Sequence, residues 1–139
     1  MKTIKKSTNP LLRIQKSTIP QAGFGAFANQ KIRKGTKVGE YKGTVLDQKK
    51  YDRLPNKQYI FEVNKKIKNK GTYKTFFIDA AKEKPGRELR FINGAHGKKQ
   101  QKMINVESYQ YAEKIFYRAR KNINPGEELI IDYGDNYWV

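Results

Sequence analysis

The sequence predicts a mostly β domain of small curved sheets with short helices. Short apolar runs, rich in β-branched and aromatic residues, alternate with turn signals along the chain. Glycine and proline mark these turns, as at Lys34-Gly35, Asn69-Lys70-Gly71 and Asn124-Pro125-Gly126. A length of 139 residues allows one domain with a modest core. Nine tyrosines and seven phenylalanines can close that core, because each ring buries a large area.

The expected strands are short and occupy much of the chain. They cover 11–16, 26–28, 37–41, 59–63, 75–78, 103–108, 114–120 and 128–133. A helix is expected over 47–54, because Asp47 can cap it and Pro55 ends it, and one helical turn is expected over 87–92. Residues 1–10 are polar and basic, and we expect a loose tail there ahead of a single domain at 11–139.

The charge balance is strongly positive. Thirty Lys and Arg residues face 13 Asp and Glu residues, which gives a formal net charge of +17. Such a field attracts polyanions, and nucleic acid is the usual partner. Lysine supplies 23 of the 30 cations, so a general bias toward lysine, as in a protein from an AT-rich genome, explains the charge equally well.

Composition excludes several kinds of site. Cysteine is absent, which removes disulfides and cysteine-bound zinc and fits a reducing, intracellular compartment. No apolar run is long enough to span a membrane, and no apolar stretch follows the basic N-terminus as in a secretory signal. His96 is the only histidine, so no metal site and no Ser-His-Asp triad are expected. Glu127 and Glu128 are expected to mark a solvated turn.

Two segments that contain glycine are candidates for a ligand site. Gly23-Phe24-Gly25 lies between two expected strands, and its glycines let the backbone approach a ligand closely. An ordinary turn is the commoner role of such a pair. In Arg90-Phe91-Ile92-Asn93-Gly94-Ala95, the amide of Asn93 can both donate and accept hydrogen bonds. Bridging the loop backbone is the commoner role of a buried asparagine.

Three tyrosines form a third candidate set. Tyr41, Tyr117 and Tyr133 each lie on or beside an expected strand. If their rings converge, they form an aromatic channel with hydroxyl groups at one end, which suits a cation such as a lysine side chain. Plain core packing is the alternative, since aromatic residues must supply much of a lean core.

In this order, the segments resemble the SET-domain family of protein lysine methyltransferases, and most of all its PR/SET branch. The similarity runs from about residue 12 to residue 138. The motifs that carry it are Gly23-Phe24-Gly25, Gly39-Glu40-Tyr41-Lys42-Gly43, Tyr59-Ile60-Phe61, Arg90-Phe91-Ile92-Asn93, Ile115-Phe116-Tyr117-Arg118, Gly126-Glu127-Glu128-Leu129 and Asp132-Tyr133-Gly134-Asp135.

The resemblance implies a fold, a cofactor and roles for residues. The implied fold has a C-terminal pseudoknot, in which the last segment threads under the loop that bears Asn93. The implied methyl donor is S-adenosylmethionine. The resemblance assigns its binding to Gly23, Phe24, Gly25, Tyr59, Arg90, Asn93 and Gly94. It assigns the lysine channel and the catalytic role to Tyr41, Tyr117 and Tyr133, with Tyr133 nearest the transfer.

The chain departs from the usual family pattern at three places. Gly94-Ala95 replaces the usual His-Ser pair, a change that is common in the PR/SET branch, whose members range from active enzymes to domains without evident activity. The cysteine-rich zinc segment that often follows the domain is missing, so we expect the N-terminal tail, a second copy in a homodimer or the substrate to close the channel. Ile131, two residues before Tyr133, leaves more room than an aromatic ring and predicts di- or trimethylation.

Two partners and two alternative functions follow. A histone tail is the expected substrate, and contact with nucleosomal DNA is expected to offset the repulsion between two basic proteins. The expected location is therefore the nucleus or chromatin. One alternative is a catalytically silent domain of the same fold that binds a peptide or nucleic acid. The other is a plain basic nucleic-acid-binding domain, which explains the charge but not the ordered motifs.

Overall fold

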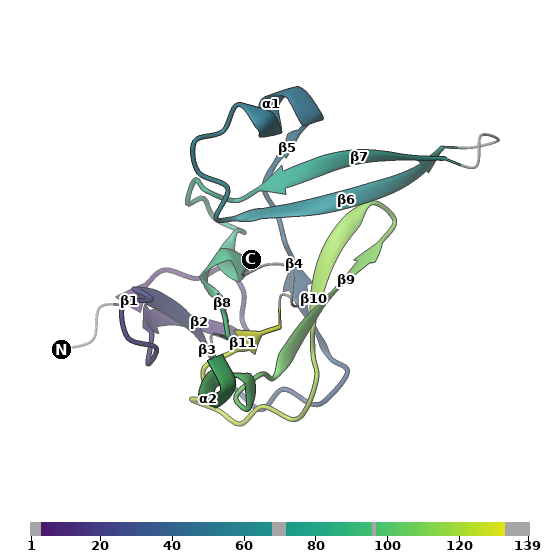
Figure 1. Ribbon diagram of the computed structural model, residues 1–139. Coiled ribbons are helices and arrows are strands. Elements are labelled where there is room, and N and C mark those ends of the chain that lie inside the picture. The colour runs from purple at the N-terminus through teal and green to yellow at the C-terminus, as the bar shows by residue number, and fades with distance from the viewer. Residues whose placement is uncertain (1–3, 68–71, 96, 133–139) are drawn as a thin grey trace.

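The computed structural model describes residues 4–67, 72–95 and 97–132. Three small sheets form the fold (Figure 1). The first sheet has the order β1 (Ile4–Lys5), β2 (Leu12–Lys16), β3 (Phe24–Ala28). The second has the order β4 (Lys37–Glu40), β10 (Lys114–Ala119), β9 (Val106–Tyr111), β11 (Ile130–Ile131), β8 (Asn93–Gly94). The third has the order β5 (Thr44–Leu46), β7 (Thr72–Asp79), β6 (Ile60–Ile67).

The helices are short, and the best expected one is present. Helix α1 (Gln48–Asp52) begins after Asp47, whose carboxylate accepts a hydrogen bond from the amide of Lys50 at 2.8 Å. The expected helical turn is the 3₁₀ helix η1 (Glu88–Phe91). Helix α2 (Gly97–Gln101) was not expected from the sequence, although Lys and Gln, which fill it, are good helix formers.

The mostly β class with short helices is confirmed, but strands β1, β5 and β8 were not expected, and several strand ends differ. Strand β9 begins at Val106 rather than at 103, because the amide of Met103 bonds to the carbonyl of Gln100 and continues the turn after α2. The last strand contains only Ile130–Ile131. The N-terminal segment is not a loose tail in the described residues, because β1 pairs with β2 through Ile4–Gln15 and Lys5–Ile14.

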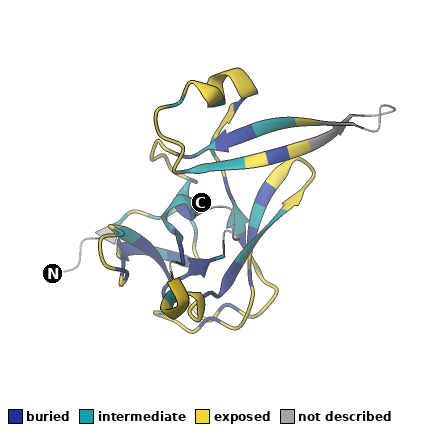
Figure 2. Ribbon diagram, in the orientation of Figure 1, coloured by how far each residue is buried: buried dark blue, intermediate teal, exposed yellow. Residues whose placement is uncertain are grey.

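The core lies between the first two sheets and reaches the third. Figure 2 shows buried residues along the strands and exposed residues on α1, α2 and the connecting loops. One buried cluster combines residues from all three sheets, among them Ile14, Val63, Val106, Leu129 and Ile131. These side chains are apolar and β-branched or aliphatic, so they pack well on pleated surfaces. Their burial supplies the main driving force for the fold.

The C-terminal strand pairs in parallel with two neighbours. Ile130 lies opposite Asn93, and Ile131 lies opposite Gly94 on one side and Val106 on the other. The buried side chain of Asn105 secures it, because its Oδ1 accepts from the amide of Ile130 at 2.8 Å and its Nδ2 donates to the carbonyl of Glu128 at 3.0 Å. This pairing brings the end of the chain beside the Asn93 segment. The threading expected for a pseudoknot lies at 133–139, outside the described residues.

A carboxylate anchors the N-terminal segment to η1. Glu88 is 6% exposed, and its Oε1 accepts hydrogen bonds from both the amide and the hydroxyl of Thr8 at 2.6 Å. Burial raises the pKa of Glu88, but the hydrogen bonds from Thr8 and neighbouring backbone groups outweigh it and hold the pKa below its usual value. The ionised form of Glu88 therefore stabilises the folded state.

Replacing Thr8 tests this anchor. Thr8→Val keeps the shape but removes the hydroxyl, and we expect it to lower the free energy of unfolding by about 1–2 kcal/mol near neutral pH. Because the folded pKa of Glu88 is lowered, the stabilisation is present above the unfolded pKa and is lost as the pH falls through the folded value, which lies below the usual one for a glutamate. The difference between the variant and the wild type should therefore shrink in urea titrations at acid pH. Exposed Thr36→Val is the control, and a difference that does not change with pH contradicts the assignment.

Candidate active site

Two of the three expected channel tyrosines pack together. Tyr117 lies on β10 and Tyr41 directly follows β4, and the amide of Tyr41 bonds to the carbonyl of Ile115 at 2.7 Å. The two rings stack with centroids 5.7 Å apart. Phe61 on β6 meets both rings edge-on, with centroids 4.6 Å from Tyr41 and 5.8 Å from Tyr117. Tyr41 is 3% exposed and Tyr117 is 0% exposed, so this aromatic cluster is water-poor.

Tyr41 connects the aromatic cluster to two residues that the sequence associated with the cofactor. Its hydroxyl donates to the carbonyl of Tyr59 at 2.8 Å. The guanidinium of Arg90 lies over the ring of Tyr59, 4.2 Å from the centroid. Stacking of this kind stabilises a partly desolvated arginine. The cluster and the Tyr59–Arg90 pair therefore form one continuous unit.

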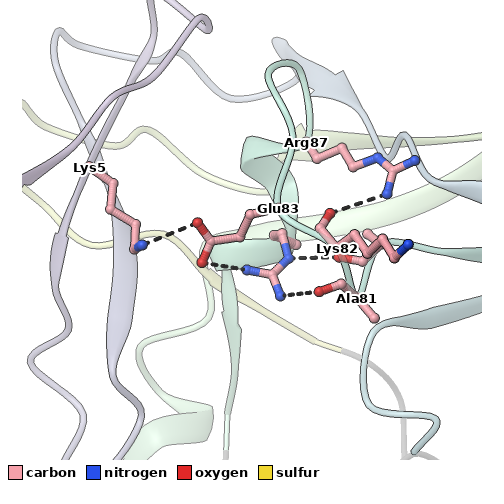
Figure 3. A network of polar contacts seen from close by, with 7 residues as sticks. Lys5, Ala81, Lys82, Glu83 and Arg87 are labelled. Atoms are coloured by element: carbon pink, nitrogen blue, oxygen red, sulfur yellow. Dashed lines mark hydrogen bonds and ion pairs between the residues drawn. The ribbon is translucent and has the colours of Figure 1, made fainter.

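Arg90 also holds the 80–83 segment in place. Its Nε donates to the carbonyl of Ala80 at 2.7 Å, and a terminal nitrogen donates to the carbonyl of Ala81 at 2.9 Å. Its other terminal nitrogen is 3.5 Å from Glu83, whose second carboxylate oxygen accepts from Lys5 of β1 at 3.1 Å (Figure 3). With these contacts, the guanidinium positions the loop beside Tyr59.

A buried carboxylate joins the two glycine-containing segments. Glu128 is 8% exposed and accepts hydrogen bonds from the hydroxyl of Ser17 at 2.6 Å and from the amide and hydroxyl of Thr18 at 2.9 and 2.6 Å. The side-chain nitrogen of Asn93 lies 3.4 Å from the same carboxylate and donates at 3.0 Å to the carbonyl of Phe24. The expectation that Glu128 lies in a solvated turn is wrong, because the bridge between Phe27 and Glu128 carries this side chain inward.

Gly25 has a structural reason to be glycine. A Cβ at this position would collide with the carboxylate of Glu128 and would lie 3.2 Å from the Cβ of Ser17. Gly23 adopts a φ of 73°, in the left-handed region that favours glycine, and its carbonyl accepts the amide of Ser17 at 2.8 Å. Both glycines thus shape the turn around Phe24, and contact of their backbone with a cofactor remains a prediction.

Phe24 and Asn93 present half-buried groups beside this network. The ring of Phe24 meets Phe91 edge-on with centroids 6.2 Å apart, and the Nζ of Lys5 lies 4.6 Å from its centroid. Phe24, Tyr59 and Asn93 are all of intermediate exposure. Aromatic faces and an amide with accessible surface suit a ligand that combines a cationic centre with polar groups.

Three residues that the sequence predicted for the site remain. Gly94 and Ile131 lie on the parallel strands β8 and β11, and Tyr133 lies outside the described residues. Gly94 on β8 and Ile131 on β11 are paired neighbours, and Ile131 belongs to the same buried cluster as Tyr41 and Tyr117. Tyr133, the expected catalytic residue, lies outside the described residues. Among those described, the structure therefore brings the channel residues and the cofactor residues of the sequence prediction into one connected region.

Two cavities flank this region. The larger, about 740 Å³, lies beside Tyr41 and is lined by residues of 40–47, β7 and the β9–β10 turn. The other, about 510 Å³, lies between the N-terminal segment and 83–91, with Phe91 in its wall. Neither of these two cavities is lined by Gly23, Phe24, Gly25 or Asn93.

Sequence reasoning missed several residues that build the site. Ser17, Thr18 and Asn105 received no role, and Phe61 appeared only within a motif. The signal for Glu128 was its place in the Gly126-Glu127-Glu128-Leu129 motif, before a buried strand, rather than in an isolated polar turn. Ser17 and Thr18 have no such signal, because their partner lies more than a hundred positions away in the sequence.

The described residues contain neither a membrane-spanning helix nor a cluster of metal ligands. No helix there is long and apolar enough to cross a membrane. In the same residues, no group of three or more His, Cys, Asp or Glu side chains is arranged to hold a metal ion.

Comparison with known proteins places this geometry in a family. The family model "PR domain zinc finger protein 2, PR domain" matches residues 12–139. The chain belongs to the PR-domain branch of the SET-domain family. It is 34% identical over 136 residues to histone-lysine N-methyltransferase set-17 of Caenorhabditis elegans, a match that covers 97% of this chain and 45% of that protein. The PR/SET domain described here spans less than half the length of the curated relatives it matches.

Solved structures are similar over nearly the whole PR/SET domain. The methyltransferase domain of human PR domain-containing protein 2 superposes with a TM-score of 0.70 at 28% identity, covering 90% of this chain and 78% of that chain. SUVH6 of Arabidopsis thaliana, solved in complex with S-adenosylmethionine, superposes with a TM-score of 0.65 at 25% identity, covering 88% of this chain and 27% of that chain. The fold expected from the sequence resemblance is confirmed.

A methyl group at Gly25 tests the carboxylate network. We expect Gly25→Ala to lower the free energy of unfolding by roughly 1–3 kcal/mol, because the added Cβ displaces the carboxylate of Glu128 from Ser17. In the background of Glu128→Ala, the same substitution should cost much less, and chemical denaturation of the four proteins of this double-mutant cycle measures the coupling. Equal costs in both backgrounds would mean that the collision with Glu128 does not explain the glycine.

Proposed function

We propose that this PR/SET domain is an S-adenosylmethionine-dependent protein lysine methyltransferase that acts on a histone tail. The observation that carries the proposal is the stacked, buried pair Tyr41 and Tyr117, which connects to Tyr59. From Tyr59 the contacts continue through Arg90, which lies over the rings of Tyr59 and Phe91, to the edge-on pair of Phe91 and Phe24. Membership of a family whose relatives are named histone-lysine N-methyltransferases supports it. A silent domain of the same fold is the alternative, and binding of the methyl donor separates the two.

The aromatic cluster provides the conditions that the substrate lysine needs. A lysine attacks only as the neutral amine, and its usual pKa lies near 10.4. Rings that exclude water disfavour the ammonium form and lower that pKa. Aromatic faces guide the cationic side chain inward, and tyrosine hydroxyls orient the lone pair along the line of attack. We assign these roles to Tyr41, Tyr117 and Tyr133.

The residues around Phe24 fit the proposed cofactor. S-adenosylmethionine, when bound, supplies an electrophilic methyl group on a sulfonium. The half-buried ring of Phe24, the Tyr59 ring and the Asn93 amide would face its cationic and polar groups, while Gly23, Gly25 and Gly94 would contribute backbone. Arg90 would act by holding Tyr59. The complex of SUVH6 with S-adenosylmethionine supports this choice of donor.

The cavity beside Tyr41 suits an extended peptide. Its charged lining is balanced on an otherwise basic chain, with three carboxylates, Glu40, Asp47 and Glu113, and three lysines, Lys42, Lys74 and Lys114. Strand β5 is an edge of its sheet, so its free side can pair with a peptide backbone. We propose that a basic tail lies in this cavity and inserts its lysine past Tyr41, with nucleosomal DNA offsetting the remaining repulsion.

The hydroxyl of Tyr133 tests the catalytic assignment. With labelled S-adenosylmethionine and core histones, Tyr133→Phe should lower kcat by roughly 100-fold or more, because a preorganised hydrogen bond at the reacting centre is removed. Tyr111→Phe is the matched control, since Tyr111 is 71% exposed. Calorimetry with S-adenosylmethionine separates an enzyme from a silent domain. If Tyr133→Phe still binds S-adenosylmethionine, its defect lies in methyl transfer. If the wild type neither binds S-adenosylmethionine nor labels histones, the protein is a silent domain.

Ile131 tests the methylation state. Ile131 is buried, and its side chain is smaller than an aromatic ring at the same position, so we expect di- or trimethylated product from the wild type at long reaction times. Ile131→Phe should shift the product toward monomethyl-lysine, and mass spectrometry of the histone reads out the ratio. Ile130→Phe on the same strand is the control. A wild type that stops at monomethyl product overturns the assignment of Ile131.

A further inference from the structure

One end of the molecule carries a dense set of exposed cations. We define the basic face as Lys31, Arg33, Lys34, Lys98, Lys99, Lys102 and Lys121, all of which are exposed. They come from segments 31–37, 97–102 and 118–124, which contain no aspartate or glutamate. In Figure 1 these segments lie at the end opposite the β5–β7–β6 sheet, and Figure 2 shows that end as largely exposed.

The backbone of the basic face is fixed by hydrogen bonds between distant segments. Ile32 and Ile123 exchange two backbone hydrogen bonds of 2.8 Å, and both side chains are buried. The amide of Lys34 donates to the side chain of Asn122 at 2.8 Å. The amide of Arg120 donates to the carbonyl of Asn105, shortly after the α2 turn, at 2.7 Å. The cations therefore project from a folded surface rather than from a tail.

The charges of the basic face are not neutralised within the described residues. The ion pairs found there use other cations, including Arg118 with Glu107 at 3.5 Å and Arg120 with Asp132 at 3.4 Å, which border the face. Like charges held close together repel, and this cost is relieved when an external anion binds. The acidic residues beside Tyr41 lie elsewhere, in the wall of the larger cavity.

We propose that the basic face binds the phosphate backbone of duplex DNA. Lysines dominate it, and as point charges they suit phosphate contacts rather than the reading of bases. Segments 31–37, 97–102 and 118–124 contain no aromatic residue. Proteins that hold single strands stack bases on aromatic side chains, so this composition favours a duplex. Binding at the basic face leaves the cavity beside Tyr41 open to a peptide and does not depend on the proposed methyl transfer.

A matched pair of triple variants tests the proposal. Lys31→Gln/Arg33→Gln/Lys34→Gln removes three of the seven cations of the basic face, and Lys49→Gln/Lys50→Gln/Arg53→Gln removes the same number of charges from exposed positions in and after α1, at the other end. Fluorescence anisotropy with a random-sequence DNA duplex, at several salt concentrations, measures binding. At low salt, the face variant should bind the duplex roughly tenfold or more weakly than the wild type. A plot of log K against log salt should also become less steep, by roughly 0.9 for each phosphate that the variant no longer neutralises.

The other outcomes overturn the proposal. Equal weakening in both variants shows that binding follows total charge rather than this face. No weakening in the face variant places the DNA elsewhere, and tighter wild-type binding to a single strand of the same length contradicts the duplex. Equal thermal unfolding midpoints of the three proteins establish that each variant is folded, since the substituted side chains are exposed.

Discussion

The buried carboxylate of Glu128 is the interaction on which the rest of the site depends. It joins the β2–β3 turn, through Ser17 and Thr18, to the strand that ends the described chain. Asn93, 3.4 Å from it, extends the connection to β8. A carboxylate taken out of water is costly unless hydrogen bonds satisfy it, so the three segments must meet for the fold to be stable. The same contacts set the positions of Phe24 and Asn93.

This requirement explains why the site has glycines and hydroxyls around an acid. Gly25 leaves space for the carboxylate, and the short side chains of Ser17 and Thr18 bring donors to it. The amide of Asn93 satisfies the carbonyl of Phe24, which faces the same network. Four residues from three separate stretches of the sequence thus surround one carboxylate. A buried polar network of this kind specifies a unique arrangement only when its members are satisfied.

Positive charge is distributed unevenly over the protein, and both the peptide proposal and the DNA proposal depend on this distribution. Lys31, Arg33 and Lys34 lie in a segment without acidic residues, whereas Glu40 and Glu113 line the cavity beside Tyr41. A uniform positive field would repel a basic peptide from the cavity, and local carboxylates weaken that field within a Debye length of about 8–10 Å. Lys42, Lys74 and Lys114 also line the cavity, so it is balanced in charge, whereas the basic face is not. This difference is what the two proposals require of the two surfaces.

How far the site was predictable depends on the range of each interaction. Tyr41 and Tyr117 were named from their strands and motifs, and the structure packs them together. Asn93 was named as a cofactor residue, but its hydrogen bonds to Phe24, Ser17 and Glu128 were not predicted. Glu128 itself was assigned to a solvated turn, because adjacent carboxylates after a Pro-Gly turn are usually exposed. The role of Tyr133 stays a prediction outside the described residues.

The sequence by itself determined the mostly β class, the cap of α1, the turn at η1 and the order of the motifs. It did not give the end of α1, which lies at Asp52 rather than at 54. The features that it determined depend on local preferences, such as the carboxylate of Asp47 before a helix or short apolar runs between glycines. Only the tertiary structure decided the parallel pairing of β11 with β8 and β9, the burial of Glu128 and the assembly of the basic face from three segments. The physical reason is that each of these joins residues far apart along the chain, and no local pattern records which partner a strand or a carboxylate will meet.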